Sequence, residues 1–489
     1  MLVRRQFNII LGKLLVGLAG LFSTQLNAIS LSSVSSKALA ELRKSISGKV
    51  IDQNQEDYDS WRRNLSWQLR KTHRRPELMV QALTNSDVRA ALHFANVHDL
   101  KVGIRTGGHS WVHSAVRDGG LLIDLRYFKD LQIDVKNKRA IAGPALTARE
   151  LTAGLAQHSL AFPVAHCSTV ALGGYLLGGG QAWNNASWGG AACNSVIGID
   201  VVNAEGELIY VDKDNYSDLF WAAKGAGPGF PGVVVSYHLH LYPLPEAIRM
   251  NTYIWPLSDT LGVSRWLAEV AEKLSDKVEI LMYLSSLPEP VDGHTQVVIV
   301  SAVAFTDSNG EAETLLMPLK GAKTLARPLI VEELTPTTFE ALLNLVDRSF
   351  FPCRAAADTF WFEQSMEEVM EQFVDHFASA PSPFTNVLCE VKPLTFKPGD
   401  SAYSMRRTTY LSPYAFWLDA KDDEVNLQWM KKTQEILAPI SQGHYINEAD
   451  LEVNPDRSEK SFSEEAWQQI EQVQLKYDPN QRFHNFLGH

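Results

Sequence analysis

The sequence predicts an α+β protein with more than one domain. Its 489 residues are too many for one ordinary hydrophobic core, and 45% of them are hydrophobic, which is enough to fill two. Short alternating apolar runs are interleaved with amphipathic helical patterns along the chain. Pro243 and Pro245 interrupt this pattern near the middle of the chain and mark the expected domain boundary.

The N-terminal segment, 1–28, has the composition of an export signal. Arg4 and Arg5 precede an apolar run, and small residues near Ala28 suit cleavage. The arginine pair is also similar to the twin-arginine motif, whose pathway exports folded proteins. Lys13 leaves 14–22 as the unbroken apolar stretch, which is shorter than the ~20 residues of a spanning helix. We expect an exported protein, periplasmic or secreted, with no stable membrane span after cleavage.

The next segments are expected to form a helical lead-in at 29–75 and a first domain at 76–245. Ser86 and Asp87 can cap a helix that carries apolar residues at helical spacing. Alternation and turn residues predict the remaining elements: strands at 101–105, 121–125, 131–135 and 139–142, a helix at 147–158, a hairpin at 196–203 and 207–211, and a long strand at 233–242.

The region 246–435 mixes strands and helices and is rich in aromatic residues, among them Trp255, Trp361 and Tyr410. Aromatic side chains combine a large apolar surface with a polar edge, which suits ligand binding. We therefore expect this region to be a substrate domain. The closing segment, 436–489, is expected to return to the first domain.

Two glycine-rich turns carry nucleophilic side chains. Gly107 and Gly108 precede His109. Cys167 precedes a glycine pair at 173–174 and a glycine triplet at 178–180. Glycine lacks a Cβ, so a bulky ligand can approach its backbone closely. Histidine and cysteine can bond to an electrophilic carbon once deprotonated. Considered alone, His109 could be a hydrogen-bonded turn histidine, and Cys167 could be an ordinary buried cysteine. Together, on two glycine-rich turns, the two residues predict a covalently held cofactor.

Four segments, in order along the chain, resemble the FAD-linked oxidases related to berberine bridge enzyme: 102–111, 162–175, 218–225 and 476–483. The resemblance implies an α+β fold with a two-subdomain PCMH-type FAD-binding domain of the vanillyl-alcohol oxidase superfamily. It further implies an α+β substrate domain with an antiparallel sheet. Ala171, Gln181 and Gln481 depart from the family pattern, as expected of a divergent bacterial member.

The same resemblance implies that FAD is bound covalently. His109 would bond the 8α-methyl carbon of the flavin, and Cys167 would bond its C6. The other residues that we assign to the cofactor are Arg105, Thr106, Gly107, Gly108, Ser110, Ser168, Thr169, Val170, Gly173, Gly174, Gly178, Gly179, Gly180 and Asn447.

Tyr445 is the expected general base. In the resembled family, a Tyr-x-Asn-Tyr-x-Asp segment brings its first tyrosine to the flavin; Tyr445, Asn447 and Asp450 match it, and Glu448 replaces the second tyrosine. An unperturbed phenol titrates near ~10, so neighbouring donors or cations must lower the pKa of such a base. The pair at 406–407, two arginines, belongs to the right domain but would equally suit a solvated face.

The resemblance implies an FAD-dependent oxidase that removes a hydride from an alcohol-type or related C–H of a sugar, phenolic or secondary-metabolite substrate. Val170 occupies the position, three residues after the attachment cysteine, at which a valine in that family accompanies the use of O2 with H2O2 as product. A dehydrogenase with another acceptor and a cofactor-free periplasmic binding protein are the alternatives. The net charge of −11 and the lack of a basic block argue against nucleic acid, so the expected partners are a small-molecule substrate and O2.

Three further patterns predict little chemistry. The glycines of 225–229 follow a helical segment, which argues against a dinucleotide fingerprint. His238 and His240 lack a third ligand at informative spacing, so no metal site is predicted. Besides Cys167 the chain has Cys193, Cys353 and Cys389; a Cys353–Cys389 disulfide is possible, and buried free thiols are favoured.

Overall fold

The computed structural model describes residues 34–325, 327–390 and 401–488, so the predicted export signal lies outside the described residues. The chain divides into two compact units, residues 1–41 and 42–489. Of the first unit the structure describes residues 34–41, in which helix α2 (Ser36–Ser45) begins. The three larger sheets of the described chain belong to the second unit. None of the described helices combines the length and the apolar character needed to cross a membrane.

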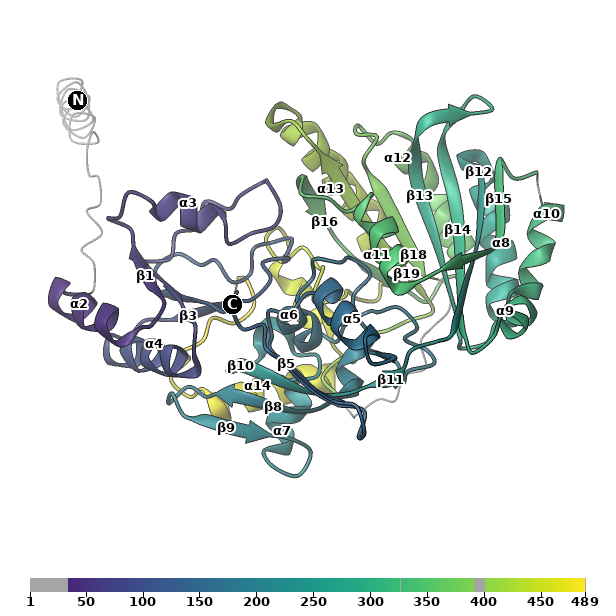
Figure 1. Ribbon diagram of the computed structural model, residues 1–489. Helices are drawn as coiled ribbons and strands as arrows, with labels where there is room; N and C mark the ends of the chain where they lie inside the picture. Colours follow the sequence, from purple (N-terminus) through teal and green to yellow (C-terminus); the bar gives the residue numbers. More distant parts are fainter. Residues whose placement is uncertain (1–33, 326, 391–400, 489) are drawn as a thin grey trace, which may run out of the picture. The chain divides into compact units, whose positions relative to one another are not determined.

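The first sheet carries the first glycine turn (Figure 1). Its strands, in the order β1-β2-β4-β3, are β1 (Lys49–Asp52), β2 (Leu78–Gln81), β4 (Leu121–Asp124) and β3 (Val102–Arg105). Strands β2, β4 and β3 run parallel, and β1 pairs with β2 antiparallel. Because β3 ends at Arg105, the turn that contains His109 begins at the carboxyl end of a parallel strand.

Strand β1 corrects the prediction of a helical lead-in. Besides α2 and α3 (Tyr58–Arg63), the lead-in contributes this edge strand, whose Val50 and Ile51 are buried. Four residues are too few to give a readable alternation, which is why the strand was not predicted. Helix α4 (Asn85–Val97) connects β2 to β3; its N-cap is Thr84, not Ser86, and Asp87 completes the capping box as its third residue.

The second sheet has five antiparallel strands: β5 (Leu131–Asp134), β6 (Arg139–Ala142), β10 (Val233–His240), β8 (Val196–Val202) and β9 (Leu208–Val211). The predicted strands and the 196–211 hairpin are thus confirmed. Helices α5 (Ala148–Ala156), α6 (Leu172–Leu177), α7 (Ser217–Ala222) and α14 (Glu464–Tyr477) belong to the same part, as does the short pair β7 (Leu160–Ala161) and β11 (Tyr242–Pro243).

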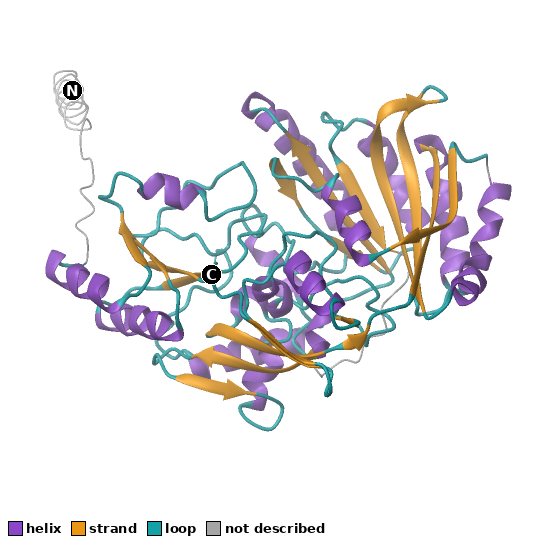
Figure 2. Ribbon diagram, in the orientation of Figure 1, coloured by secondary structure: helices purple, strands orange, loops and turns teal. Residues whose placement is uncertain are grey.

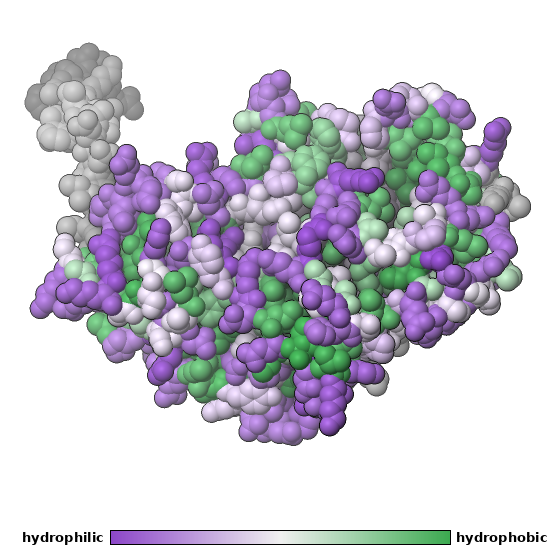
Figure 3. Space-filling model, viewed as in Figure 1, coloured by the Kyte–Doolittle hydropathy of each residue, from purple (hydrophilic) through white to green (hydrophobic). Residues whose placement is uncertain are grey.

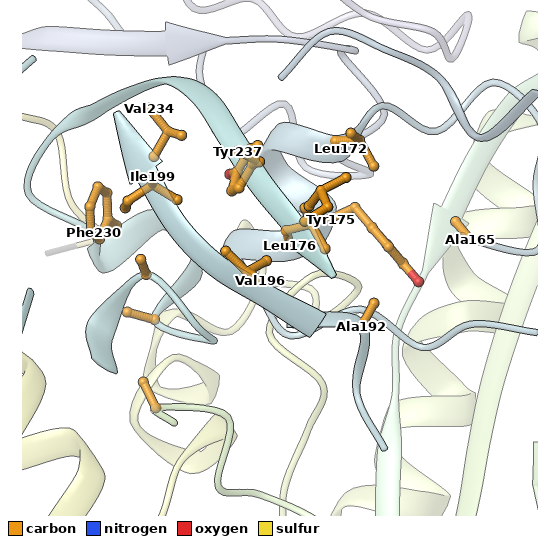
Figure 4. Close-up of a cluster of buried hydrophobic side chains, with 14 of the residues drawn as sticks. Ala165, Leu172, Tyr175, Leu176, Ala192, Val196, Ile199, Phe230, Val234 and Tyr237 are labelled. Atoms are coloured by element: carbon orange, nitrogen blue, oxygen red, sulfur yellow. The ribbon is translucent and has the colours of Figure 1, made fainter. Parts of the chain in front are cut away.

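Helix α6 connects this sheet to the second glycine turn. Its Tyr175 and Leu176 lie among Val196, Ile199 and other buried residues of β8 and β10 (Figure 4). The helix begins at Leu172, directly after the loop that contains Cys167. Packing of α6 on the sheet therefore fixes the start of the second glycine turn.

The third sheet is antiparallel and has eight strands: β15 (Ile330–Thr337), β12 (Ala247–Pro256), β14 (His294–Thr306), β13 (Val278–Val291), β18 (Asn386–Glu390), β19 (Thr409–Trp417) and β16 (Arg354–Ala357), with β17 (Phe360–Phe362) also on β19. Its helices are α8 (Thr260–Ala271), α9 (Asn309–Leu316), α10 (Ala322–Leu325), α11 (Phe339–Asp347), α12 (Met366–Ala378) and α13 (Asp423–Leu437) (Figure 2). The antiparallel sheet predicted for the second half is confirmed.

The two faces of this sheet have different partners. Met282 of β13 and Leu411 of β19 belong to the core that helices α8, α12 and α13 cover. Since side chains alternate along a strand, the next residues, Tyr283 and Tyr410, lie on the opposite face. On the side viewed in Figure 3, hydrophobic groups are interspersed with hydrophilic ones over the surface.

The closing segment lies beside the first sheet. Val102 of β3 forms a β-bridge with Phe483. The Val102 N–H donates to the Arg482 carbonyl at 2.8 Å, and the Val102 carbonyl accepts from the His484 N–H at 2.9 Å. The domain boundaries at 245 and 435 stay predictions. All four cysteines are free, and Cys193, Cys353 and Cys389 are buried, as favoured from the sequence.

A buried ion pair supports the segment that contains Tyr445. Asp358 is fully buried and pairs with Arg457, which is 4% exposed. The Asp358 carboxylate also accepts hydrogen bonds from the Gln434 side chain at 3.0 Å and from the Asp450 N–H at 3.2 Å. These contacts fix the end of the 445–450 segment.

We predict that Asp358→Asn destabilises the fold by about 3–5 kcal/mol, because it leaves the Arg457 guanidinium buried without a counter-charge. The matched control is Asp214→Asn, which removes an ion pair with Lys213; both side chains are exposed, so water screens the pair and the change should leave stability nearly unaltered. Denaturant midpoints of the two purified variants provide the measurement. Equal midpoints would contradict the prediction.

Candidate functional site

A cavity of about 320 Å³ lies between the two glycine turns and the third sheet, on the face of that sheet that the helices leave uncovered. Most of the residues assigned to the cofactor or to catalysis line it. They are Arg105, Thr106, Gly107, Gly108, His109, Ser110, Cys167, Val170, Gly173, Gly174, Tyr445 and Asn447. Tyr283, Leu388 and Tyr414 of the third sheet also line it, so the cavity is bounded by parts of the chain that are distant in sequence.

The two glycine turns are in direct contact. A Cβ on Gly107 would lie 2.7 Å from the Cβ of Ala171, and a Cβ on Gly173 would lie 2.6 Å from the methyl carbon of Thr106. Both distances are too short for real carbon atoms, so larger side chains would push the turns apart. These glycines therefore serve the contact between the two turns.

Arg105 braces the first turn. Its guanidinium donates to the Leu65 carbonyl at 3.0 Å, to the Gly107 carbonyl at 3.1 Å and to Asp124 at 3.1 Å. Gly108 has a φ of +74°, a backbone conformation that favours glycine. The turn is thus held by its own arginine, with His109 directly after it.

The side chains of His109 and Cys167 meet at one hydroxyl. The Oγ1 of Thr169 lies 2.7 Å from His109 Nε2 and 3.5 Å from Cys167 Sγ. On its other side, the imidazole stacks on Trp67 with ring centroids 4.6 Å apart. The two predicted attachment residues therefore lie together on one wall of the cavity, in defined orientations.

Burial controls the protonation of both side chains. It lowers the pKa of His109 to about 4, with a further lowering by Arg105, so the imidazole is neutral at neutral pH and keeps a nucleophilic lone pair. Burial raises the pKa of the Cys167 thiol, which a hydrogen bond from Thr169 partly counters. The thiol is consequently protonated at neutral pH, and bond formation from it requires a proton acceptor.

Asp347, at the end of α11, supports the second turn. Its carboxylate accepts from the Ser168 hydroxyl at 2.6 Å and the Ser168 N–H at 3.1 Å, and it pairs with Arg149 at 2.8 Å. The Cys167 thiol donates toward the same carboxylate over 3.9 Å. Ser168 and Thr169 do not line the cavity; they hold the residues that do.

Gly178, Gly179 and Gly180 also lie behind the wall of the cavity. A Cβ on Gly178 would lie 1.9 Å from the Asn447 side chain, and one on Gly179 would lie 2.6 Å from the Tyr403 ring. The Gly180 N–H donates to the Tyr445 hydroxyl at 3.1 Å. The triple glycine thus allows close approach of Asn447, Tyr403 and Tyr445, and its assignment to the cofactor stays a prediction.

The Tyr445 hydroxyl lies between two donors, since Asn447 Nδ2 also donates to it at 2.9 Å. Burial nevertheless raises the pKa of Tyr445 well above its ordinary value, and the nearby Tyr403 and Glu448 add to this. Arg406, at 406–407, pairs with Glu390 at 3.3 Å. A tyrosine base was expected to have a lowered pKa, but without substrate the pKa of Tyr445 is raised instead.

The wall fits a large flat cofactor. Gly174 is exposed at the cavity, and no heavy atom lies within 4 Å of a Cβ built on it, so bare backbone faces open space. His109 and Cys167 stand on the same wall as this open backbone. Gly227 and Pro228 of the 225–229 segment line the cavity as well.

Sequence reasoning missed Trp67 and Asp347. Neither belongs to a motif, and each is far from the turn that it contacts, so no local pattern could identify it. The histidine pair at 238 and 240, for which no metal site was predicted, contributes to the second sheet: His238 Nε2 lies 3.0 Å from Asp200 Oδ2. Among the described residues, no cluster of His, Cys, Asp or Glu could hold a metal ion.

Comparison with known proteins agrees with this geometry. A family model described as FAD binding domain matches residues 76–212. The FAD-linked oxidoreductase nodO of Hypoxylon pulicicidum is 29% identical over 422 residues, which cover 84% of this chain and 91% of that protein.

Two solved structures share the fold. One is 6-hydroxy-D-nicotine oxidase from Arthrobacter nicotinovorans, with a TM-score of 0.79 and 23% identity over 91% of this chain and 98% of that one. The other is BBE-like 1 of Physcomitrella patens, with a TM-score of 0.77 and 17% identity over 91% of this chain and 98% of that one. The alternative of a cofactor-free binding protein is not supported. The chain is therefore an FAD-linked oxidoreductase with an FAD-binding domain at residues 76–212, and it shares the fold of the berberine bridge enzyme-like proteins.

Proposed function

We propose that the protein is an oxidase with bicovalently attached FAD. It would remove a hydride from an alcohol-type or related C–H of a sugar, phenolic or secondary-metabolite substrate and pass the electrons to O2, which gives H2O2. The predicted signal at 1–28 supports export, to the periplasm or beyond, by the twin-arginine route.

The observation that carries the proposal is the shared contact at Thr169. Its hydroxyl lies 2.7 Å from His109 Nε2 and 3.5 Å from Cys167 Sγ, which brings both nucleophiles to one wall of the cavity. Bare backbone at Gly174 faces the same space. Two nucleophiles beside such a surface favour attachment at two points over attachment at one.

FAD, when bound, supplies the hydride acceptor. The protein side chains supply position and proton transfer. Tyr445 would accept the proton of the substrate hydroxyl, while Gly180 N–H and Asn447 Nδ2 donate to its oxygen and so stabilise the phenolate. The aromatic side chains Tyr283 and Tyr414, which also line the cavity, would help to exclude water from it.

Val170 supports the use of O2. Its side chain is half-buried and lines the cavity three residues after Cys167. A branched side chain of this small size leaves more room at the wall than isoleucine or leucine would, and O2 needs only a narrow path.

The attachment of FAD is tested by acid precipitation. The wild-type protein should give a yellow pellet. His109→Ala and Cys167→Ala should each keep one bond and a yellow pellet, whereas the double variant should release its flavin into the supernatant. A colourless wild-type pellet would exclude covalent attachment, and a colourless pellet from either single variant would exclude the second bond.

Tyr445→Phe tests the base. We expect kcat to fall about 10²–10⁴-fold with flavin content unchanged, since a general base contributes a factor of this order. Because burial raises the pKa of Tyr445, the phenol is protonated at neutral pH, so the wild-type kcat/KM should rise as the pH increases. The rise should be absent in the variant. Parallel pH profiles would assign the proton transfer to another group.

Val170→Leu tests the use of O2. We expect the rate of H2O2 formation to fall, because the longer side chain narrows the path for O2, while the rate with a dye acceptor persists. Stopped-flow reoxidation of the reduced enzyme in air provides the measurement. A wild-type enzyme that stays reduced in air would instead identify a dehydrogenase.

A further inference from the structure

Glu448 stands on the wall of the cavity, where the family pattern has tyrosine. One oxygen of its carboxylate, Oε2, accepts hydrogen bonds from three hydroxyl groups of β19. The donors are Tyr410 at 3.3 Å, Ser412 at 3.0 Å and Tyr414 at 2.8 Å. The three donors lie on alternate residues of one strand, so they share one face of the sheet. The carboxylate is therefore held in a fixed orientation.

Glu448 forms no ion pair in the described part of the chain; His166, whose charge acts on it, is itself paired with Glu279. None of the described Lys, Arg or His residues lies within ion-pair distance of it, and no hydrogen bond between described residues reaches its second oxygen, Oε1. Other half-buried acids nearby are paired: Glu279 with His166 at 2.6 Å and Glu390 with Arg406 at 3.3 Å. Among the residues that line the cavity, Glu448 is the only Asp or Glu.

A half-buried carboxylate without an ion-pair partner is costly, because hydroxyl groups replace only part of its hydration. Burial accordingly raises the pKa of Glu448, although the hydroxyls of Tyr414, Ser412 and Tyr410 oppose this. A cation that arrives with a ligand would remove the cost, since an opposite charge at short range favours the ionised carboxylate. The site is thus built to favour a positively charged group over a neutral one.

The neighbouring walls are aromatic. Trp111, Phe350 and Tyr414 line the cavity with Glu448, and Phe350 packs on Tyr414 with ring centroids 4.9 Å apart. Aromatic rings attract both apolar surface and cations. The chemistry that matches these walls is an aromatic or apolar body that carries an ammonium group.

We propose that the substrate carries a protonated amine, which Glu448 binds through its second carboxylate oxygen while the body of the substrate packs on the aromatic wall. The inference rests on the proposed function, in that it takes this cavity as the place where the substrate binds. Glu448 is then the residue that selects amine-containing substrates over neutral ones of the same shape.

The test compares tryptamine with tryptophol, which have the same ring system and differ in their ammonium and hydroxyl ends. Isothermal titration calorimetry on the purified flavin-loaded protein, without O2, measures the two dissociation constants. We expect tryptamine to bind about tenfold tighter or more, as for a hydrogen bond between charged groups. Equal dissociation constants in the wild-type protein would overturn the proposal without any variant.

Three variants locate the charge. Glu448→Gln should abolish the preference for tryptamine, and Glu448→Asp should retain part of it. The matched control is Glu279→Gln, which removes a carboxylate that already pairs with His166 and should leave the preference unchanged. A preference that survives Glu448→Gln, or that disappears in Glu279→Gln, would overturn the assignment.

Failure of this inference is separate from failure of the proposed oxidase function. The calorimeter measures binding of the two probes, whereas the colour of the acid-precipitated pellet reports covalent flavin. A yellow pellet with equal affinities refutes the amine site alone, and a colourless pellet refutes the bicovalent oxidase.

Discussion

The direct contact between the two glycine turns is the constraint on which the site depends. Gly107 lies against Ala171, and Gly173 lies against Thr106, at distances that leave no room for a side chain. This contact brings the hydroxyl of Thr169 to both His109 and Cys167. Without it, the two nucleophiles would belong to separate surfaces, one on the first sheet and one before α6.

The remaining walls come from two other parts of the chain, and both are tied to the turns. The third sheet presents Tyr283 of β13 and Tyr414 of β19 to the cavity, because its other face is covered by helices. The closing segment reaches the same place through contacts of its own, including Asp218 on α7, which accepts from Lys476 at 2.6 Å and Tyr477 at 2.7 Å. The site is therefore the meeting point of all three sheets and the C-terminal segment.

The sequence predicted the elements and motifs whose signals are local. Alternation identified β8 and β9, and the glycine turns identified the wall of the cavity. At the triple glycine of 178–180, the side chain of Asn447 lies against Gly178, a contact across a long separation in sequence that no local pattern predicts. Trp67 and Asp347 act across long separations in sequence, where no spacing rule connects them to His109 or Cys167.

The bridge between Val102 and Phe483 has a consequence for the order of events during folding. Phe483, His484 and Asn485 line the cavity beside the turn that contains His109, although they lie far from it in the sequence. The binding site is therefore incomplete until this long-range contact has formed, even where the glycine turns have folded locally. Cofactor capture thus depends on docking of the closing segment, which makes loading of the cofactor a late step in folding.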